Sequence, residues 1–379
     1  MNIRACFLIL SVCLLMSGCR GNVKVTDGDR LCVDKILDTD IQCTMEDMGY
    51  KADVILLETS DSVLLPNNPV IKYVSDSDIY ISADRILYRF DNGGKFKNKI
   101  GRRGGGPMEY SMMYSCAVDD STGLVHIYAG NGRVVVWSVD GKPVKELSLK
   151  SDGYISGVFF DKGKYFAEER INVSGAEDTR IVWFDTAGNR IAAIPVLHNA
   201  TEGDMTYRDA SIFNRDALSY LYYNNALSQI QRVGIDSLSI ALDLDFGKFE
   251  VDPNRIGDMD YRSQTKESTA ELLDFVFSDD ALFLAMRKGS HLNVAVIDGD
   301  GICRFSGAMT DPRRGGGIAI GGDNDLKFWP YKSRGKYMYS LNENTGDDVR
   351  AWVLQHATNP GIGFDENSNQ YVIRVSKVE

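Results

Sequence analysis

The sequence predicts an all-β protein, a six-bladed β-propeller, and the first observation behind this prediction is a repeat. Five segments share one pattern of an apolar strand, a turn of Asp, Gly or Asn, and a second strand. Their turns are marked by Asp91, Asp140, Asp185, Asp236 and Asp298, which are 49, 45, 51 and 62 residues apart. Such intervals are typical of one four-stranded propeller blade.

The second observation is the composition of the strands. Residues 134–137 and 181–184 are apolar at consecutive positions, so both faces of these strands must be buried between stacked sheets. A β-sandwich is the alternative, but it would favour cleaner alternation and shorter intervals between turns. Strand-like runs predict blades one to five over residues 69–100, 115–149, 156–195, 210–244 and 272–305.

The third observation is an incomplete last blade. Residues 318–320, 326–329 and 371–375 supply three strands, which would leave an open edge. The early apolar run at residues 54–57 can fill that place beside residues 371–375, so that both ends of the chain close the ring. Seven blades remain the alternative count.

The first residues predict export. Arg4 precedes an apolar run over residues 5–16, which is too short to span a bilayer as a helix and is typical of a signal peptide. Met16-Ser17-Gly18-Cys19 resembles a bacterial lipobox, which would make Cys19 the lipid-attachment site; an ordinary secretory signal is the alternative. The predicted organisation is a signal peptide over residues 1–18, a polar tether over residues 19–52 and the propeller over residues 53–379.

Charge and cysteine content exclude some classes of partner. Removal of residues 1–18, which carry one Arg and no acid, moves the formal net charge from −11 to −12, and such an acidic chain disfavours nucleic-acid binding. Cys32 with Cys43 is the only locally plausible disulfide, and free buried thiols are the alternative. No spacing resembles a metal-binding pair of cysteines, and we expect neither a metal nor a cofactor.

A resemblance rests on residues 99–110, with residues 87–91 and 94–96 before them. This string looks like the signature of the six-bladed β-propeller lipoproteins of Bacteroidetes, which are similar in layout to NHL-repeat propellers. Residues 57–59 with Asp61 and Ser62 are also similar to the opening of that family, whereas Met108 stands where the family usually has glycine. The resemblance implies the fold and export, and little about biochemical function.

Two near-identical loops provide the main candidate site. Residues 102–106 and 313–317 both read Arg-Arg-Gly-Gly-Gly, and both follow the outer strand of a blade, which predicts that they share one face. Guanidinium groups bind carboxylate, phosphate or sulfate through two hydrogen bonds. The hypothesis is an anionic ligand held by residues of these loops and of the same face, namely Arg102, Arg103, Glu109, Tyr110, His291, Arg313 and Arg314. The alternative is structural, with the glycines permitting a sharp turn and each Arg pairing with Glu109 or a nearby Asp.

Other candidates are weaker. His291 follows a Lys-Gly-Ser turn and could act as an acid or base, although a lone loop histidine is more often solvated. Residues 76–78 and 298–301 echo calcium loops but lack the bidentate glutamate, and turns are the favoured interpretation. Aromatic residues could stack on sugars, but at this spacing they usually fill the core between blades: Trp137, Trp183, Tyr222, Tyr223 and Trp329.

The function predicted is a lipid-anchored binding or assembly module of the bacterial envelope that presents a rigid rim to a glycan, peptide or partner protein. The competing class is a hydrolase or lyase acting on an anionic polysaccharide or envelope polymer, with His291 or Tyr110 as the proton carrier. Residues 20–24 lack the acidic run that resembles a surface-export tag. The expected location is therefore the outer membrane, on the leaflet that faces the periplasm.

Overall fold

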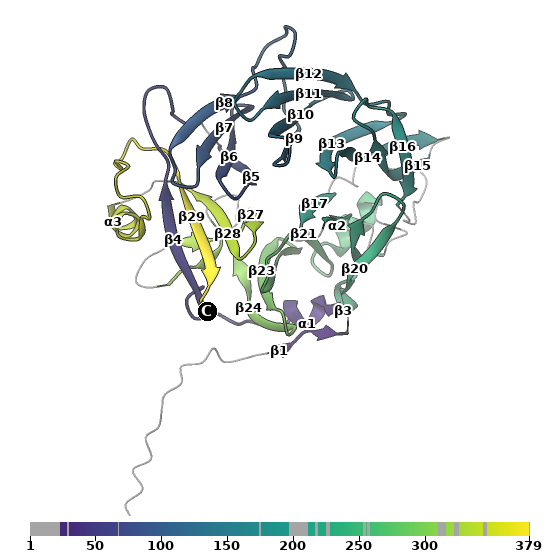
Figure 1. The fold of residues 1–379 in the computed structure, drawn as a ribbon. Helices are drawn as coiled ribbons and strands as arrows, with labels where there is room; N and C mark the ends of the chain where they lie inside the picture. The colour runs from purple at the N-terminus through teal and green to yellow at the C-terminus, as the bar shows by residue number, and fades with distance from the viewer. Residues whose placement is uncertain are drawn as a thin grey trace, which may run out of the picture.

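The protein is a ring of β-sheets. The computed structural model describes residues 23–28, 30–66, 68–173, 176–196, 211–216, 219–224, 228–252, 255, 258–309, 316–321, 326–343 and 347–378. Within these residues, six sheets radiate from a common centre, and each contributes four antiparallel strands to one blade (Figure 1). This arrangement confirms the predicted all-β, six-bladed propeller.

We letter the strands of each blade a to d from the centre outward. Blade one is β5 (Val70–Val74), β6 (Asp78–Ala83), β7 (Ile86–Asp91) and β8 (Phe96–Ile100); blade two is β9 (Ser115–Asp119), β10 (Leu124–Gly130), β11 (Arg133–Ser138) and β12 (Pro143–Ser148). Blade three is β13 (Tyr154–Asp161), β14 (Lys164–Val173), β15 (Ala176–Phe184) and β16 (Arg190–Pro195).

The second half of the ring follows the same order. Blade four is β17 (Ile212–Arg215), β18 (Tyr220–Tyr223), β19 (Gln229–Val233) and β20 (Leu238–Asp245). Blade five is β21 (Ala270–Phe277), β22 (Ala281–Lys288), β23 (His291–Asp298) and β24 (Ile302–Met309). Blade six is β27 (Lys332–Arg334), β28 (Tyr337–Asn342), β29 (Tyr371–Lys377) and β4 (Tyr50–Leu56).

The repeated aspartate shapes the c-to-d turns. A carboxylate oxygen of Asp91 accepts hydrogen bonds from the backbone N–H groups of Gly93 and Lys95, each at 2.9 Å. The carboxylates of Asp185 and Asp298 accept the same pair of backbone bonds in blades three and five. Such side-chain bonds to the backbone stabilise a tight turn. Residues 298–301 therefore form the turn that the sequence favours.

Blade two departs from this pattern. At the corresponding position after the c strand, Ser138 accepts the backbone N–H of Lys142 through its hydroxyl at 3.2 Å. Asp140, which marks the repeat in the sequence, lies within the turn and is exposed.

Large aromatic side chains fill the space between blades, as expected for a stacked ring. The five candidates for sugar stacking are all buried in core clusters: Trp137, Trp183, Tyr222, Tyr223 and Trp329. Their role in the core between blades is confirmed.

The two ends of the chain meet in blade six. β4 pairs antiparallel with β29, with Val54 opposite Ile373 and Leu56 opposite Tyr371. The chain starts that sheet from its outer edge and completes it with its last strand, as predicted (Figure 1).

The inner half of blade six differs from the prediction, which placed residues 318–320 and 326–329 in this blade. Residues 318–320 and 326–329 contribute to a separate two-stranded sheet, β25 (Ile318–Ala319) and β26 (Lys327–Phe328). The inner strands are instead β27 and β28. β27 has the sequence Lys-Ser-Arg, because an inner strand near the axis does not need an apolar surface on both faces.

The N-terminal segment also differs from the prediction of a tether over residues 19–52. β1 (Val23–Lys24) pairs with the outer strand of blade five, and β3 (Arg30–Cys32) pairs in parallel with the outer strand of blade four. β2 (Thr26–Asp27) and helix α1 (Val33–Leu37) complete this segment. Four of its apolar residues are buried against the ring: Val25, Leu31, Val33 and Ile36. From residue 23 onward, the segment is part of the folded domain.

The cysteines of this segment are not joined. Cys32 is buried, and the Cys43 thiol donates a hydrogen bond to the carbonyl of Arg304 at 3.1 Å. None of the four cysteines in the described part of the chain forms a disulfide.

Few helices interrupt the sheets. A 3-10 turn (Gly247–Phe249) and α2 (Met259–Thr265) lie in the connection from blade four to blade five, and α3 (Asp347–His356) lies outside blade six (Figure 1). In the described ranges, no helix has the length and apolar character needed to cross a membrane.

Candidate binding face around the central axis

The connections of the ring divide into two faces. Because the strands of a blade alternate in direction, the d-to-a and b-to-c connections open on one face, which we call the d-to-a face. The a-to-b and c-to-d turns open on the opposite c-to-d face. Residues 101–114 connect β8 to β9 and so belong to the d-to-a face.

In the first arginine loop, both guanidinium groups have carboxylate neighbours. Arg103 lies 3.2 Å from Asp84 of the b-to-c turn, and Arg102 lies 3.8 Å from Glu109. Glu109 also accepts the backbone N–H of Gly106 at 3.0 Å. A Cβ atom added at Gly104 would lie 2.0 Å from the Glu109 carboxylate, so the glycine permits this close approach. The glycine of this loop is therefore explained by close packing against Glu109. Both arginines remain largely exposed.

Tyr110 does not join the arginines at the surface. Its side chain is 1% exposed and packs in the core between blades one and two. Its hydroxyl has no hydrogen-bond partner in the described part of the chain, and burial raises its pKa. Gly101, at φ +92°, makes room for this ring, because a Cβ there would lie 2.0 Å from the Tyr110 oxygen. A proton-carrying role for Tyr110 is therefore disfavoured.

The second arginine loop cannot be placed. Arg313 and Arg314 lie outside the described residues, so their predicted convergence with Arg102 and Arg103 stays a prediction.

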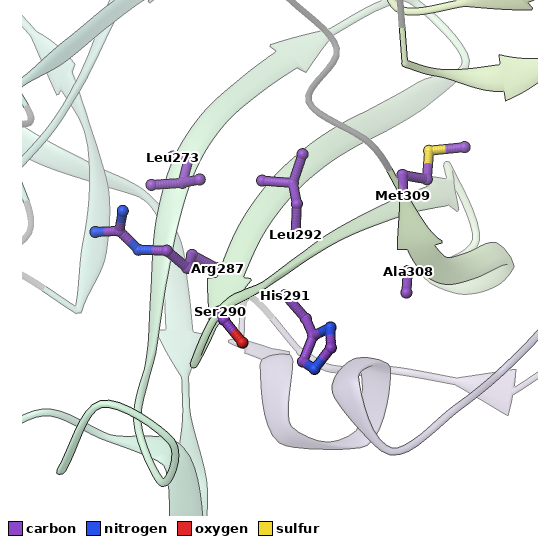
Figure 2. A pocket seen from close by; sticks show the side chains of 7 residues that line it. All are labelled: Leu273, Arg287, Ser290, His291, Leu292, Ala308 and Met309. Atoms are coloured by element: carbon purple, nitrogen blue, oxygen red, sulfur yellow. The ribbon is translucent and has the colours of Figure 1, made fainter. Parts of the chain in front are cut away.

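His291 lines a pocket of about 500 Å³ at the d-to-a end of blade five (Figure 2). The lining residues are Leu273, Arg287, Ser290, His291, Leu292, Ala308 and Met309. Figure 2 shows the imidazole and the guanidinium of Arg287 extending in different directions. Arg287 forms an ion pair with Glu271. The pocket thus offers one exposed imidazole beside apolar walls, and its arginine already has a carboxylate partner.

A group of exposed apolar side chains lies on the d-to-a face of blades one to three. We call this group the apolar rim: Val70 at 42%, Met112 at 37%, Tyr114 at 50% and Tyr154 at 63% exposed. Each stands at or just before the start of an inner strand in blades one to three. The Tyr114 ring packs on Tyr128, with ring centroids 5.9 Å apart, which fixes its position. The rim was not predicted from the sequence. The one sign of it there is that Tyr114 and Tyr154 lie just outside the predicted strands of blades two and three.

The inner strands carry charged side chains toward the axis, where propellers have a central channel. We call four half-buried residues from four blades the axial cluster: Lys72 on β5, Cys116 on β9, Asp274 on β21 and Lys332 on β27. Burial lowers the pKa of the Lys332 amine, Asp274 opposes this change and the charge of Lys72 adds to it. Burial raises the pKa of the Cys116 thiol to about 11, so the thiol is neutral at pH 7. β5 contacts both β9 and β27, and β27 contacts β21, so the inner strands that carry these four residues lie side by side around the axis.

At the c-to-d end of the axis, two arginines have carboxylate partners. Arg334 of β27 lies 3.0 Å from Asp76 and 3.4 Å from Asp120. Arg215 of β17 lies 3.6 Å from Asp161. These pairs link blades across the ring, and this end carries more carboxylates than guanidinium groups.

Two buried carboxylates in blade three serve the structure. Glu169 accepts hydrogen bonds from Ser151 and Arg190 at 2.6 and 2.7 Å. Glu168 pairs with Arg170 at 2.7 Å and accepts the hydroxyl of Tyr222 at 2.7 Å. Buried charges require such compensation, and these contacts connect blade three with its neighbours.

The fold and this face define a closed six-bladed β-propeller with exposed apolar side chains on the d-to-a face of blades one to three. The chain belongs to the family described as "Domain of unknown function (DUF4934)", which matches residues 30–371. None of the curated proteins matches the sequence.

A solved structure supports the fold. A protein of Bacteroides fragilis described as a candidate exported protein is similar to this chain with a TM-score of 0.61 and 16% identity, over 90% of this chain and 98% of that one. A member of the DUF4221 family from Bacteroides vulgatus matches with a TM-score of 0.43 and 7% identity, over 86% and 98% of the two chains. BamB of Moraxella catarrhalis matches with a TM-score of 0.39 and 15% identity, over 68% and 69%.

Proposed function

We propose that this protein is a lipid-anchored binding module of the bacterial envelope, which receives a glycan, peptide or partner protein on its d-to-a face. The observation that carries the proposal is the apolar rim. Exposed apolar groups gathered on one surface mark interaction sites, and tyrosine is favoured there because it offers a rigid ring and a polar hydroxyl. The opposite face, with its paired charges, offers no comparable group among the described residues.

The enzymatic alternative has less support. It requires an acid and a base that converge with the arginines around one pocket. Tyr110 is buried in the core, Arg102 and Arg103 face Glu109 and Asp84, and the pocket of His291 lies in blade five. The described residues therefore favour binding over hydrolysis or elimination.

The binding proposal predicts that the rim carries affinity. Replacing Tyr114 and Tyr154 by Ser should weaken binding to an array of uronate-containing and neutral envelope glycans at least about tenfold, because aromatic anchors at an interface each contribute about 1–2 kcal/mol. The measurement is array binding of the purified mature protein, followed by calorimetry with each glycan bound by the wild type.

A matched control uses exposed apolar residues away from the axis. Val144 and Ile191, on the outer strands of blades two and three, are exposed to a similar degree, at 51% and 44%. Their replacement by Ser should leave binding unchanged. Equal losses in both double variants, or no loss in the rim variant, would refute the role of the rim.

The anchor is proposed from the lipobox-like Met16-Ser17-Gly18-Cys19, and the exported neighbour from Bacteroides fragilis supports an envelope location, with the periplasm-facing leaflet favoured. Cells fed labelled palmitate should incorporate the label into the wild-type protein and not into the Cys19→Ala variant, because lipidation requires that thiol and the amine freed by cleavage. Label that persists in the variant would contradict the anchor.

A further inference from the structure

The two lysines of the axial cluster lack the carboxylate partners that Arg215 and Arg334 have near the axis. Arg334 and Arg215 each lie within ion-pair distance of a carboxylate. By contrast, the side-chain amines of Lys72 and Lys332 form no ion pair or hydrogen bond with another residue in the described ranges. Both side chains are half-buried, which means that water reaches them inside the ring.

Strand geometry directs Lys332 toward the axis. Side chains alternate along a strand, so Lys332 and Arg334 share one side of β27 and Ser333 faces the other. The Ser333 hydroxyl donates to the carbonyl of Phe277 in blade five at 2.8 Å. Arg334 extends the opposite way, to Asp76 and Asp120 beyond the inner strands of blades one and two. Lys332 is therefore on the axial side.

A β-bulge directs Lys72. In blade one, Ile71 pairs with Ile81 and Tyr73 pairs with Tyr80, so Lys72 is the extra residue between them. Bulges re-aim a side chain out of the regular alternation. The next residue, Tyr73, donates its hydroxyl to Asp120 of blade two at 2.6 Å, which leaves Lys72 on the inner edge of the blade.

The charges of the axial cluster do not cancel. Among the described residues of the cluster, two ammonium groups accompany one carboxylate, that of Asp274, while the Cys116 thiol is neutral at pH 7. Like charges held close together in a partly desolvated space repel more strongly than they would in bulk water. A ligand with one negative charge would remove this repulsion and supply the missing hydrogen-bond acceptors.

We propose that Lys72 and Lys332 form a binding site for one anionic group of a ligand, a carboxylate or sulfate, that enters the ring from the d-to-a face. The direction follows from the chain, because the inner strands run from the d-to-a face toward the c-to-d face and both lysines precede the charged pairs at the far end. The acidic c-to-d end, with Asp76, Asp120 and Asp161, disfavours entry of an anion there. The inference deepens the proposed function by naming the chemistry of the group that the face would receive.

The test uses inorganic sulfate as the probe. Calorimetry of the purified mature protein with sodium sulfate, in sodium chloride of matched ionic strength, should show one binding site. Lys72→Met and Lys332→Met should each weaken sulfate binding at least about tenfold, because each removes one of two charge-assisted contacts. Lys95→Met, at an exposed c-to-d turn, is the control and should bind sulfate as the wild type does.

A second measurement separates binding from folding. In chloride, Lys332→Met should unfold at a higher temperature than the wild type, because the variant no longer holds two ammonium groups together. Absence of sulfate binding by the wild type, or equal binding by the wild type and both axial variants, would overturn the proposal. Lower stability of Lys332→Met together with unchanged sulfate binding would show a purely structural lysine.

Two further probes identify the source of the anion. Galacturonate and N-acetyl-alanylalanine both carry a carboxylate, and their methyl esters provide neutral controls. Tighter binding of the sugar acid would indicate a glycan, and tighter binding of the peptide would indicate a chain terminus. Because none of these measurements uses Tyr114 or Tyr154, the axial site and the apolar rim can fail independently.

Discussion

Replacing Ile373 by Asp is expected to prevent formation of the closed ring. Ile373 is fully buried and lies opposite Val54 in the seam between β4 and β29. A carboxylate there would lose its hydration without gaining a partner, which costs at least about 4 kcal/mol. That cost is a large fraction of the stability of an ordinary domain. Circular dichroism and gel filtration should show loss of the cooperative transition or aggregation of the variant.

The control for this prediction lies in the same pair of strands. Lys51 is exposed and stands opposite Ser376, so Lys51→Gln should unfold within about 0.5 kcal/mol of the wild type. A native melting curve for Ile373→Asp would mean that the two ends of the chain do not share a sheet.

The second large effect is expected on the free energy of unfolding when the pH is lowered. His126 is 6% exposed, stacks on Phe160 with ring centroids 4.0 Å apart, and shares a hydrogen bond of 2.8 Å with the Tyr165 hydroxyl. Burial lowers its pKa from 6.5 to about 4; Asp119 opposes this change, and Lys145 adds to it. The folded protein therefore holds a neutral imidazole at pH values where the unfolded chain binds a proton.

The sign of the pH dependence follows from this difference. Above pH 6.5 the imidazole is neutral in both states and contributes no dependence. As the pH falls from 6.5 toward 4, the unfolded state alone gains a proton, so the free energy of unfolding decreases by up to about 3 kcal/mol. Urea denaturation between pH 7.5 and 4.5 measures this slope.

Variants assign the slope to one residue. His126→Gln should flatten the dependence between pH 6.5 and 4.5, whatever its effect on stability at pH 7.5. His291→Gln, at an exposed position, should retain the wild-type slope. An unchanged slope in His126→Gln would assign the acid sensitivity to other groups.

Much of the fold can be predicted from the sequence, because the c-to-d turns are stabilised by hydrogen bonds between residues close together in the chain. The carboxylates of Asp91, Asp185 and Asp298 each accept the backbone N–H groups of the residues two and four positions later, so both the residue and its spacing recur in the sequence. β27 could not be predicted in this way, because its lysine and arginine lie near the axis and the strand lacks the apolar pattern of a core strand. β1 and β3 are only two and three residues long, and their partners lie in distant blades.

The candidate site is less predictable for a related reason. The sequence places residues 101–110 correctly in a d-to-a connection, but it cannot tell that Tyr110 turns into the core while Tyr114 turns to the surface. These two tyrosines are four positions apart in the sequence, and their exposed fractions are 1% and 50%. The axial cluster is equally hidden, because its members come from four blades and meet only when the ring is closed.

The seam also sets the order of events in synthesis. β4 (Tyr50–Leu56) is made early, whereas its partner β29 (Tyr371–Lys377) follows only after the strands of the other five blades. Until β29 has been made, the outermost strand of blade six has no neighbour and exposes unpaired backbone hydrogen-bonding groups to any other extended chain. Ring closure is consequently a late step dominated by contacts distant in sequence, and such contacts form slowly. A holding chaperone that shields this early strand would be of most use before β29 appears.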